Sequence, residues 1–426
     1  MPKPKLALIP ASQGSKVFSV LPSDGSGDFD FSRSGKATRI NSQGLIEEVS
    51  NGQSRLNYPM IDGKVVGCPS HLLEPQRTNL ITYSEDFSDS SWSKSRASVV
   101  LNSTISPDGS LNASKLVEDT TSGGHILYKN NITTGAGINT LSVKVKANGR
   151  NWVLLYDSEQ GEAVYFDIKN GVAGTIVGTP DAYSIKKLPN GWYDISLTTT
   201  ATLRVDFQIY TAESDGNNAY LGDGVSGIYV WGAQLEQGSY PTSYIPTNGT
   251  TVTRSAETAT GSGDAATFND SEGVLMAEIS ALSDEGGIRA ISLNNGSAQN
   301  RISIRYNSTS NQIQYQYTVG GSVQANILAN VVDVKTPHKI AVKYKLNDFE
   351  LFIDGISRGT DLVGSIMPSG TLTNLDFNGS GSIDYFYGNT KQIQYYNSAL
   401  TDSELEELTS WESFLEMAAG QNYTIK

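Results

Sequence analysis

The sequence predicts an all-β protein built from two antiparallel β-sandwiches. Two observations support this prediction: the 426 residues include 42 glycines but only 18% charged residues, and many short segments alternate apolar with polar side chains. Strands joined by tight turns have this composition, and alternation gives each strand one buried face. A chain of this length also exceeds what one compact core usually organises, so more than one domain is expected.

Residues 1–80 are predicted to form a small β-rich attachment or oligomerisation segment. The short apolar pieces KLALI, KVFSV, DFDFS and GLIEEV are separated by turn signals such as SDGSG and RSGKA. Each piece is too short to bury much surface alone. We therefore expect this segment to depend on a neighbouring domain or on sister chains.

The two sandwiches are expected at residues 81–256 and 271–400, with a linker at 257–270. The first region contains longer alternating strands, of which NWVLLYD, AVYFDIKNG and LRVDFQIYT are examples. The region from 257 to 270, TATGSGDAATFND and its neighbours, has few large apolar residues and is typical of a linker. In the second region, HKIAVKYKLNDFELFIDG has the pattern of a β-hairpin.

A helix is predicted at residues 401–420. Thr401 and Glu404 have the spacing of a capping box, in which each side chain bonds the other residue's backbone amide. An apolar face is expected to follow it and to pack on a sandwich or on another subunit. Its members are Leu405, Leu408, Trp411, Phe414 and Leu415.

The charge of the chain disfavours a nucleic-acid partner. The formal net charge is −13 and the isoelectric point is near 4.8, whereas phosphate binding needs clustered Lys and Arg. The N-terminal apolar run LALI is too short for a signal peptide, and no stretch reaches the ~18 apolar residues of a membrane span. We expect a protein made in the cytoplasm that does not insert into membranes. Cys68, the one cysteine, is expected to be a small buried residue.

Residues with catalytic or metal-binding chemistry show no convergent pattern. The three histidines, at 71, 125 and 338, are expected in turns or at strand ends. Asp157, Glu159 and Glu162 are interpreted as solvated acids of a hairpin turn, although glycoside hydrolysis needs only two suitably spaced carboxylates. Asp354 and the run that contains Asp24, Asp28 and Asp30 lack the regular spacing of a calcium loop, so no catalytic residue, metal ligand or cofactor is predicted. Calcium stays an unsupported possibility.

Aromatic side chains are the remaining candidates for a ligand site. Trp152, Tyr156 and Tyr210 lie on strands whose other face is apolar, so they are glycan-binding candidates, with packing in a core as the alternative. A second aromatic group, with Tyr240 and Tyr244, occurs in QGSYPTSYIPTNG.

That second group is predicted to be a structural clamp. Pro241 and Pro246 hold the chain extended and cannot donate hydrogen bonds to a sheet. Together with Ile245, the two tyrosines are expected to pack against residues 77–87, bringing the two ends of the first sandwich together.

Several motifs resemble a known family. CPSHLLEPQRTNLITYSEDFSDSSWSKS, KLPNGWYDISLT and GIYVWGAQLEQGSYPTSYIPTNGTTVTRSAE resemble a module of tailed-bacteriophage virion proteins called a head spike or head fibre domain, similar in fold to carbohydrate-binding modules. FDFSRSGKATRINSQGLIEEVSNGQSRLNYP resembles the segment that precedes this module. The C-terminal hairpin and QIQYYNSALTDSELEELTS resemble concanavalin A-like, laminin-G-type domains.

The resemblance implies a non-enzymatic virion protein, a head fibre or tail fibre appendage. Its expected partners are itself, as a homotrimer, the capsid or tail proteins of the particle, and host-surface polysaccharide. Two alternatives stay open: a polysaccharide depolymerase with paired carboxylates, and a purely structural decoration or connector without glycan binding. No strand carries the E-x-D-x-E pattern of glycosidases on the concanavalin A-like fold.

Overall fold

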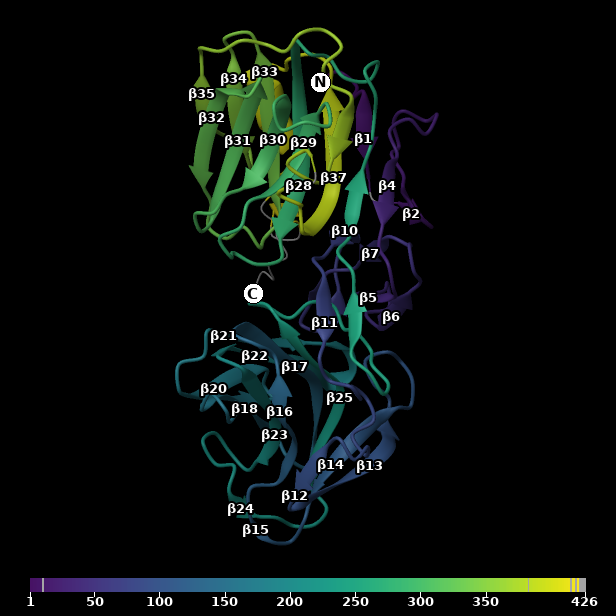
Figure 1. The fold of residues 1–426 in the computed structure, drawn as a ribbon, viewed down its shortest axis with the longest axis vertical. Coiled ribbons are helices and arrows are strands. Elements are labelled where there is room, and N and C mark those ends of the chain that lie inside the picture. The colour runs from purple at the N-terminus through teal and green to yellow at the C-terminus, as the bar shows by residue number, and fades with distance from the viewer. Residues whose placement is uncertain (10, 382, 414–415, 418–419, 421–426) are drawn as a thin grey trace.

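The computed structural model describes residues 1–9, 11–381, 383–413, 416–417 and 420. Figure 1 shows an elongated molecule with one β-sandwich at each end and short N-terminal strands along the side and between them. This arrangement confirms the predicted all-β fold class. None of the helices in the described part of the chain is long and apolar enough to cross a membrane.

The first sandwich consists of two six-stranded antiparallel sheets. The sheet called here sheet I has the order β12 (Ser93–Ser95), β16 (Ile126–Thr133), β23 (Arg204–Ala212), β18 (Trp152–Asp157), β19 (Glu162–Asp167), β20 (Val172–Val177). Sheet II has the order β13 (Ala97–Thr104), β14 (Ala113–Glu118), β25 (Gly227–Gln237), β17 (Gly137–Asn148), β22 (Trp192–Ala201), β21 (Ala182–Lys187). A two-stranded ribbon, β15 (Ser122–Gly123) with β24 (Tyr220–Leu221), and a 3₁₀ turn, Pro189–Gly191, complete this sandwich.

Alternating side chains fill the space between sheets I and II. Val153 and Leu155 of β18 face Val143 and Val145 of β17 in one fully buried cluster. The residues between them in sequence therefore point away from this core. The same parity applies to every long strand of sheet I and decides which side chains reach its outer face.

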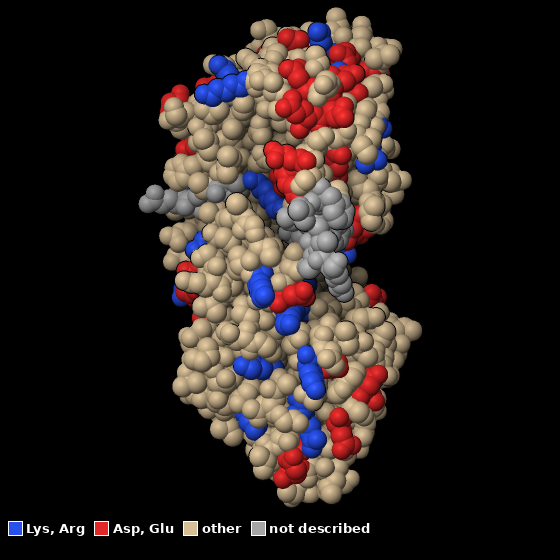
Figure 2. Space-filling view, turned by 180° about the vertical axis from the view of Figure 1, so that it is seen from behind, with Lys and Arg blue, Asp and Glu red and all other residues tan. Residues whose placement is uncertain are grey.

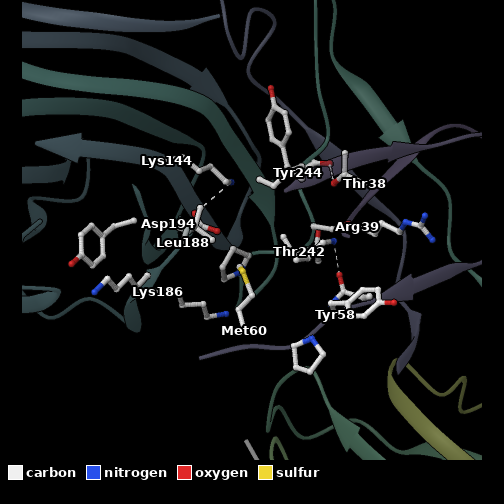
Figure 3. Close-up of a pocket in the computed structure, with 18 of the residues that line it drawn as sticks. Thr38, Arg39, Tyr58, Met60, Lys144, Lys186, Leu188, Asp194, Thr242 and Tyr244 are labelled. Atoms are coloured by element: carbon white, nitrogen blue, oxygen red, sulfur yellow. Dashed lines mark hydrogen bonds and ion pairs between the residues drawn. The ribbon is translucent and has the colours of Figure 1, made fainter. Parts of the chain in front are cut away.

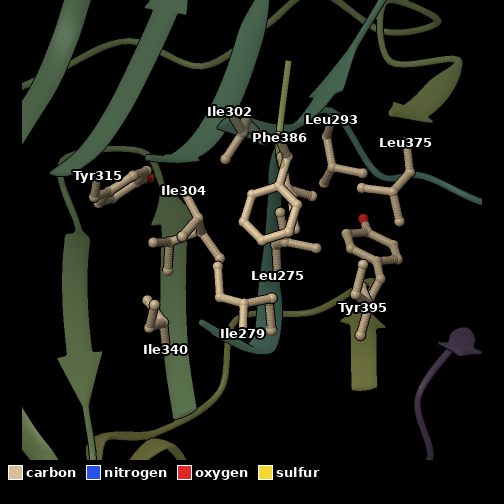
Figure 4. Close-up of a cluster of buried hydrophobic side chains, with 14 of the residues drawn as sticks. Leu275, Ile279, Leu293, Ile302, Ile304, Tyr315, Ile340, Leu375, Phe386 and Tyr395 are labelled. Carbon is tan, nitrogen blue, oxygen red and sulfur yellow. The ribbon is translucent and has the colours of Figure 1, made fainter. Parts of the chain in front are cut away.

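The second sandwich has an eight-stranded and a five-stranded sheet. The first contains β35 (Ile356–Asp361), β34 (Phe349–Ile353), β33 (His338–Lys345), β28 (Glu272–Ala281), β37 (Gly388–Tyr396), β10 (Ser70–Leu73), β7 (Arg55–Asn57), and β1 (Leu6–Leu8) paired to β37. The second contains β32 (Ser322–Asn330), β31 (Gln312–Val319), β30 (Arg301–Tyr306), β29 (Arg289–Asn294), β36 (Asn374–Asp376). Figure 4 shows its core, where Phe386 and Tyr395 pack among aliphatic side chains such as Leu275 and Ile304. The hairpin predicted from HKIAVKYKLNDFELFIDG is confirmed as β33 and β34.

The N-terminal segment is part of the second sandwich. Leu6 lies opposite Tyr395 and His71 lies opposite Thr390, so β1 and β10 both pair with β37, at different places along its length. The other strands of the N-terminal segment form a small sheet and three ribbons. The small sheet contains β2 (Ser12–Gln13), β3 (Lys16–Val17), β4 (Phe29–Ser32) and β27 (Thr258–Thr260). The two-stranded ribbons are β5 (Ala37–Ile40) with β6 (Ile46–Val49), β8 (Met60–Ile61) with β9 (Lys64–Val65), and β11 (Arg77–Asn79) with β26 (Val252–Arg254).

Two local expectations differ from the structure. Residues 257–270, expected as a linker, contain β27 paired with β4, and Ala259 and Phe268 are buried in the core of the second sandwich. Three strand residues and two apolar side chains give too weak a local signal to be seen in the sequence. Cys68, expected to be buried, is exposed, because it lies in the loop between β9 and β10.

The C-terminal helix α1 spans Asp402–Thr409 and ends earlier than predicted. Its capping box is confirmed: Thr401 accepts from the backbone amide of Glu404, and the Glu404 carboxylate accepts from the amide of Thr401. Leu405 and Leu408 pack on Val274 and Met276 of β28, on the outer side of the second sandwich. Phe414 and Leu415 lie outside the described residues.

A buried network of charges joins the N-terminal segment to the chain between the two sandwiches. Arg55 Nε donates to Glu257 Oε1 at 2.9 Å, and Arg33 Nη1 donates to the same oxygen at 2.8 Å. Glu74 pairs with Arg55 at 2.8 Å and with Arg254 at 2.7 Å. Burial opposes ionisation of Glu74, but Arg254 and Arg55 overcome it and lower its pKa to about 2. Glu74 therefore stays ionised, and the network fixes both sandwiches to the same segment.

Candidate functional site

The outer face of sheet I carries the three aromatic residues singled out from the sequence. Trp152 and Tyr156 lie on β18, with Leu154 between them, and Tyr210 lies directly opposite Leu154 on β23. All three aromatic side chains are half-buried and lie outside the sandwich core. The ring centroids of Tyr156 and Tyr210 are 6.3 Å apart. The structure thus brings the three candidates onto one accessible surface.

Strand register adds residues that the sequence reasoning missed. Tyr128 of β16 and Tyr156 both lie opposite Gln208, and Tyr165 of β19 lies opposite Leu154. We call the surface formed by the half-buried side chains of Trp152, Tyr128, Tyr156 and Tyr210, together with the buried side chains of Tyr165 and Gln208 on the same side of the sheet, the aromatic face. Their parity along each strand could have shown that they point outward. Which strands are neighbours in the sheet, however, is not visible in the local sequence pattern.

Hydrogen bonds hold the aromatic face in place. The Tyr210 hydroxyl donates to Gln208 Oε1 at 2.9 Å, and Gln208 Nε2 donates to Asn130 Oδ1 at 3.0 Å and to Ser158 Oγ at 2.7 Å. The Tyr165 hydroxyl donates to Asn218 Oδ1 at 2.8 Å. Side chains that are already oriented lose less entropy when a ligand binds.

The hydroxyls of Tyr210 and Tyr165 on this face are neutral donors. Burial, with the neighbouring rings of Tyr156, Tyr165 and Tyr128, raises the pKa of Tyr210 to about 12. Burial also raises the pKa of Tyr165. Neutral phenols, an amide and flat aromatic rings together offer both hydrogen bonds and apolar surface, which suits the edges and faces of a polyhydroxylated ring.

The clamp residues lie against the entry strand of the first sandwich. Tyr244 shares a 2.6 Å hydrogen bond with Ser84 Oγ and donates to Glu85 at 2.9 Å. The carbonyl of Ile245 accepts from Asn79 Nδ2 at 2.8 Å, and the Arg77 guanidinium lies 5.5 Å from the centre of the Tyr240 ring. Pro241 and Pro246 are half-buried beside them. The segment therefore lies along residues 77–87, with β26 continuing the contact by pairing with β11.

Asp157 differs from its expected role as a solvated turn acid. It is buried, and its carboxylate accepts from Thr199 Oγ1 and from the amide of Asp206, each at 2.9 Å. Burial raises its pKa. The side chain has this environment because Asp157 has the parity of Val153 and Leu155 and so points inward at the end of β18. Glu159 is exposed and Glu162 half-buried in the same hairpin.

The other candidate groups are engaged in local contacts. His71, His125 and His338 are all buried, and His338 Nδ1 lies 2.6 Å from Asp354 Oδ2. Asp24 accepts from Ser26, Asp28 accepts from the amide of Ser19, and Asp30 pairs with Lys16. Within the described ranges, no three His, Cys, Asp or Glu side chains are grouped so that they could hold a metal ion.

The fold and the aromatic face together define an all-β protein of two antiparallel sandwiches, with an ordered surface of aromatic and amide side chains on one of them. No family model matches the sequence, and no curated protein matches it.

Solved structures show local likeness. The carbohydrate-binding module CBM40 of the Ruminococcus gnavus IT-sialidase, bound to α2,3-sialyllactose, is 16% identical over 33% of this chain and 84% of its own, with a TM-score of 0.29. Domains LG4-5 of the mouse laminin α1 chain are 9% identical over 66% of this chain and 92% of their own, with a TM-score of 0.24. A GH43 protein of Bacillus licheniformis is 12% identical over 87% of this chain and 83% of its own, with a TM-score of 0.23. At these TM-scores the likenesses carry no argument about function.

Proposed function

We propose that this protein is a non-enzymatic, glycan-binding appendage of a tailed-bacteriophage particle, a head fibre or tail fibre. The observation that carries the binding part is the aromatic face, where Tyr156, Tyr210 and Trp152 lie half-buried on one surface and Tyr210 is oriented by its hydrogen bond to Gln208. The virion part is supported by the motif resemblance of about residues 15–256 to head fibre and head spike modules. The elongated shape, with a sandwich at each end, suits a projecting appendage.

Binding would occur by stacking of sugar rings on the aromatic side chains. Such a surface is shallow and gives weak affinity per site, since only one side of the ligand is buried. Several copies on one particle multiply weak affinities through effective concentration. A homotrimer, the oligomer that we propose, would supply three such faces.

A glycan array tests the binding part. The wild-type chain is expected to bind at least one host-surface polysaccharide or its fragments, and Tyr210→Ala is expected to weaken that binding at least roughly tenfold, as for an aromatic hot spot. Tyr183→Ala is the matched control, because Tyr183 is an exposed tyrosine on β21 of the opposite sheet. If no glycan binds above background, the protein is a structural decoration instead.

Two further measurements separate the remaining alternatives. Release of new reducing ends from host polysaccharide would overturn the non-enzymatic part and favour a depolymerase. Immunogold labelling of intact particles would place the protein on head or tail, and absence of label from purified particles would overturn the virion part.

A further inference from the structure

A cavity of about 580 Å³ lies between the first sandwich and the N-terminal segment, on the side opposite the aromatic face. Its floor is the outer face of sheet II, from β17, β22 and β21. Its walls come from the N-terminal segment, with Thr38 and Met60, and from the clamp, with Thr242 and Tyr244 (Figure 3). A volume of this size accommodates a ligand as large as a small saccharide.

Three charged residues cross the floor of this cavity in one row. Asp194 of β22 lies opposite Lys144 of β17 on one side and opposite Lys186 of β21 on the other. The row thus carries one excess positive charge: Lys144 is the ion-pair partner of Asp194, whereas the Lys186 side chain is exposed and forms no ion pair with it. On the side of the molecule shown in Figure 2, acidic side chains gather on the second sandwich and most of the basic ones lie below them, so a local excess of cations occurs despite the acidic net charge.

The ion pair in this row is incompletely coordinated. The Lys144 side chain is 3% exposed and that of Asp194 is 26% exposed, and the ammonium lies 3.4 Å from Asp194 Oδ1 and 5.2 Å from the centre of the Tyr244 ring. Asp194 Oδ1 has no hydrogen-bond partner in the described part of the chain. An ammonium group has three donors, so the single contact with Asp194 leaves Lys144 able to donate to a further acceptor. An acceptor-rich ligand in the cavity would supply one.

The cavity is also lined by two further cations, Arg39 and Lys187, and by two further carboxylates, Asp62 and Glu74, which leave its excess positive charge at one. The neutral polar groups are hydroxyls and amides of Asn57, Tyr58, Asn170, Tyr193, Tyr240 and Thr242. Such neutral donors and acceptors suit the hydroxyl groups of a sugar, while the lysines suit a carboxylate.

We propose that this cavity binds a small acidic sugar of the uronic acid type, whose carboxylate contacts Lys144 and Lys186. The inference rests on sheet II and the clamp and is independent of the glycan site proposed on sheet I. Binding at this place would also tie the N-terminal segment to the first sandwich, since both contribute to the cavity.

Isothermal titration calorimetry of the full chain with digalacturonate tests the proposal. The wild type is expected to bind at millimolar concentration or tighter, with affinity falling as salt rises. Lys186→Ala is expected to weaken binding roughly tenfold, the effect of one lost charge-assisted contact. Asp194→Asn, which removes the competing carboxylate, is expected to tighten it.

A control variant makes the outcome decisive. Lys115→Ala, on β14 of the same sheet but outside the cavity, is expected to leave digalacturonate binding unchanged. The proposal is overturned if digalacturonate does not bind, or if Lys186→Ala and Asp194→Asn both bind like the wild type. Inorganic phosphate binding as tightly as digalacturonate would overturn the sugar specificity.

Discussion

Arg55 and Glu257 are separated by 202 residues in the sequence and form a buried, two-point contact, Nε with Oε1 at 2.9 Å and Nη2 with Oε2. Neither side chain reaches solvent. Arg55 belongs to the N-terminal segment, and Glu257 follows the last strand of the first sandwich. The contact therefore closes the N-terminal segment onto the chain that leads into the second sandwich.

Removing the charge of Glu257 is expected to be strongly destabilising. Glu257→Gln leaves Arg33 buried without its counter-charge and Arg55 with Glu74 as its remaining partner, which costs about 3–5 kcal/mol of unfolding free energy. Urea unfolding followed by tryptophan fluorescence measures this loss. Lys16→Ala, which breaks the exposed pair with Asp30, is the control and is expected to change the unfolding free energy little. Equal midpoints for Glu257→Gln and wild type would contradict the importance of the network.

His71 is expected to make the fold sensitive to mild acid. Burial lowers its pKa to about 4, with Glu257 opposing and Arg55 reinforcing that shift, and neither ring nitrogen has a hydrogen-bond partner among the described residues. Since the unfolded chain binds a proton near pH 6.5 and the folded chain does not, unfolding free energy falls as pH drops from about 6.5 to 4. The total loss is about 3 kcal/mol.

His71→Leu tests this pH dependence. The His71 ring lies 5.9 Å from those of Phe31 and Phe377, so an apolar side chain suits the site. Unfolding free energies at pH 7.5 and pH 5 are expected to differ less in the variant than in the wild type. The low pKa of Glu74 adds its own loss only below about pH 4.5, outside this window. An identical difference in both proteins would rule out His71 as the cause.

Gly174 is expected to position Trp152 on the aromatic face. A Cβ atom at residue 174 would lie 2.6 Å from Cζ3 of Trp152 and would also collide with the Asp215 carboxylate. Gly174→Ala should therefore displace the indole and weaken glycan binding severalfold, with little change in the unfolding midpoint. Gly287→Ala, at a residue without a positive φ where the added atom meets nothing, serves to show the effect of a glycine substitution as such. Wild-type glycan affinity in Gly174→Ala would argue against a role for Trp152.

Leu8 is expected to contribute to the core of the second sandwich. It is fully buried on β1 opposite Ile393 of β37, so Leu8→Ala should lower the unfolding free energy by about 2–5 kcal/mol. The next residue, Ile9, is 59% exposed, and Ile9→Ala should have little effect. Similar stability of the two variants would mean that β1 does not pack as described.

Local sequence patterns correctly predicted strands, a hairpin and a helix start, which depend on residues close together in the chain. The alternation of Ile340, Val342 and Tyr344 predicts a strand and its hairpin partner, and Thr401 with Glu404 predicts a helix start. Partners distant in the sequence were not predictable: nothing near Leu6 indicates pairing with Tyr395, since strand pairing depends on which face becomes buried.

The candidate site was likewise predictable only where it depends on local sequence. Trp152 and Tyr156 are two positions on the same face of one strand, so alternation places them together. Tyr128 and Tyr165 join them only because their strands lie close to that strand in the sheet, which the local sequence does not show. Asp157 was predicted wrongly because the residues after it look like a turn, although its own position in the alternation points its side chain into the core.

The pairing of β1 and β10 with β37 also sets the order in which the molecule can be completed during synthesis. Strand β1 lacks its partner strand, and β10 has only β7 beside it, until residues 388–396 have left the ribosome, while residues 81–256 already contain both sheets of their own sandwich. The first sandwich can thus fold early, as domains generally do on the ribosome. Strands β1 and β10 each keep an unpaired edge through most of translation and join the last strand only at the end.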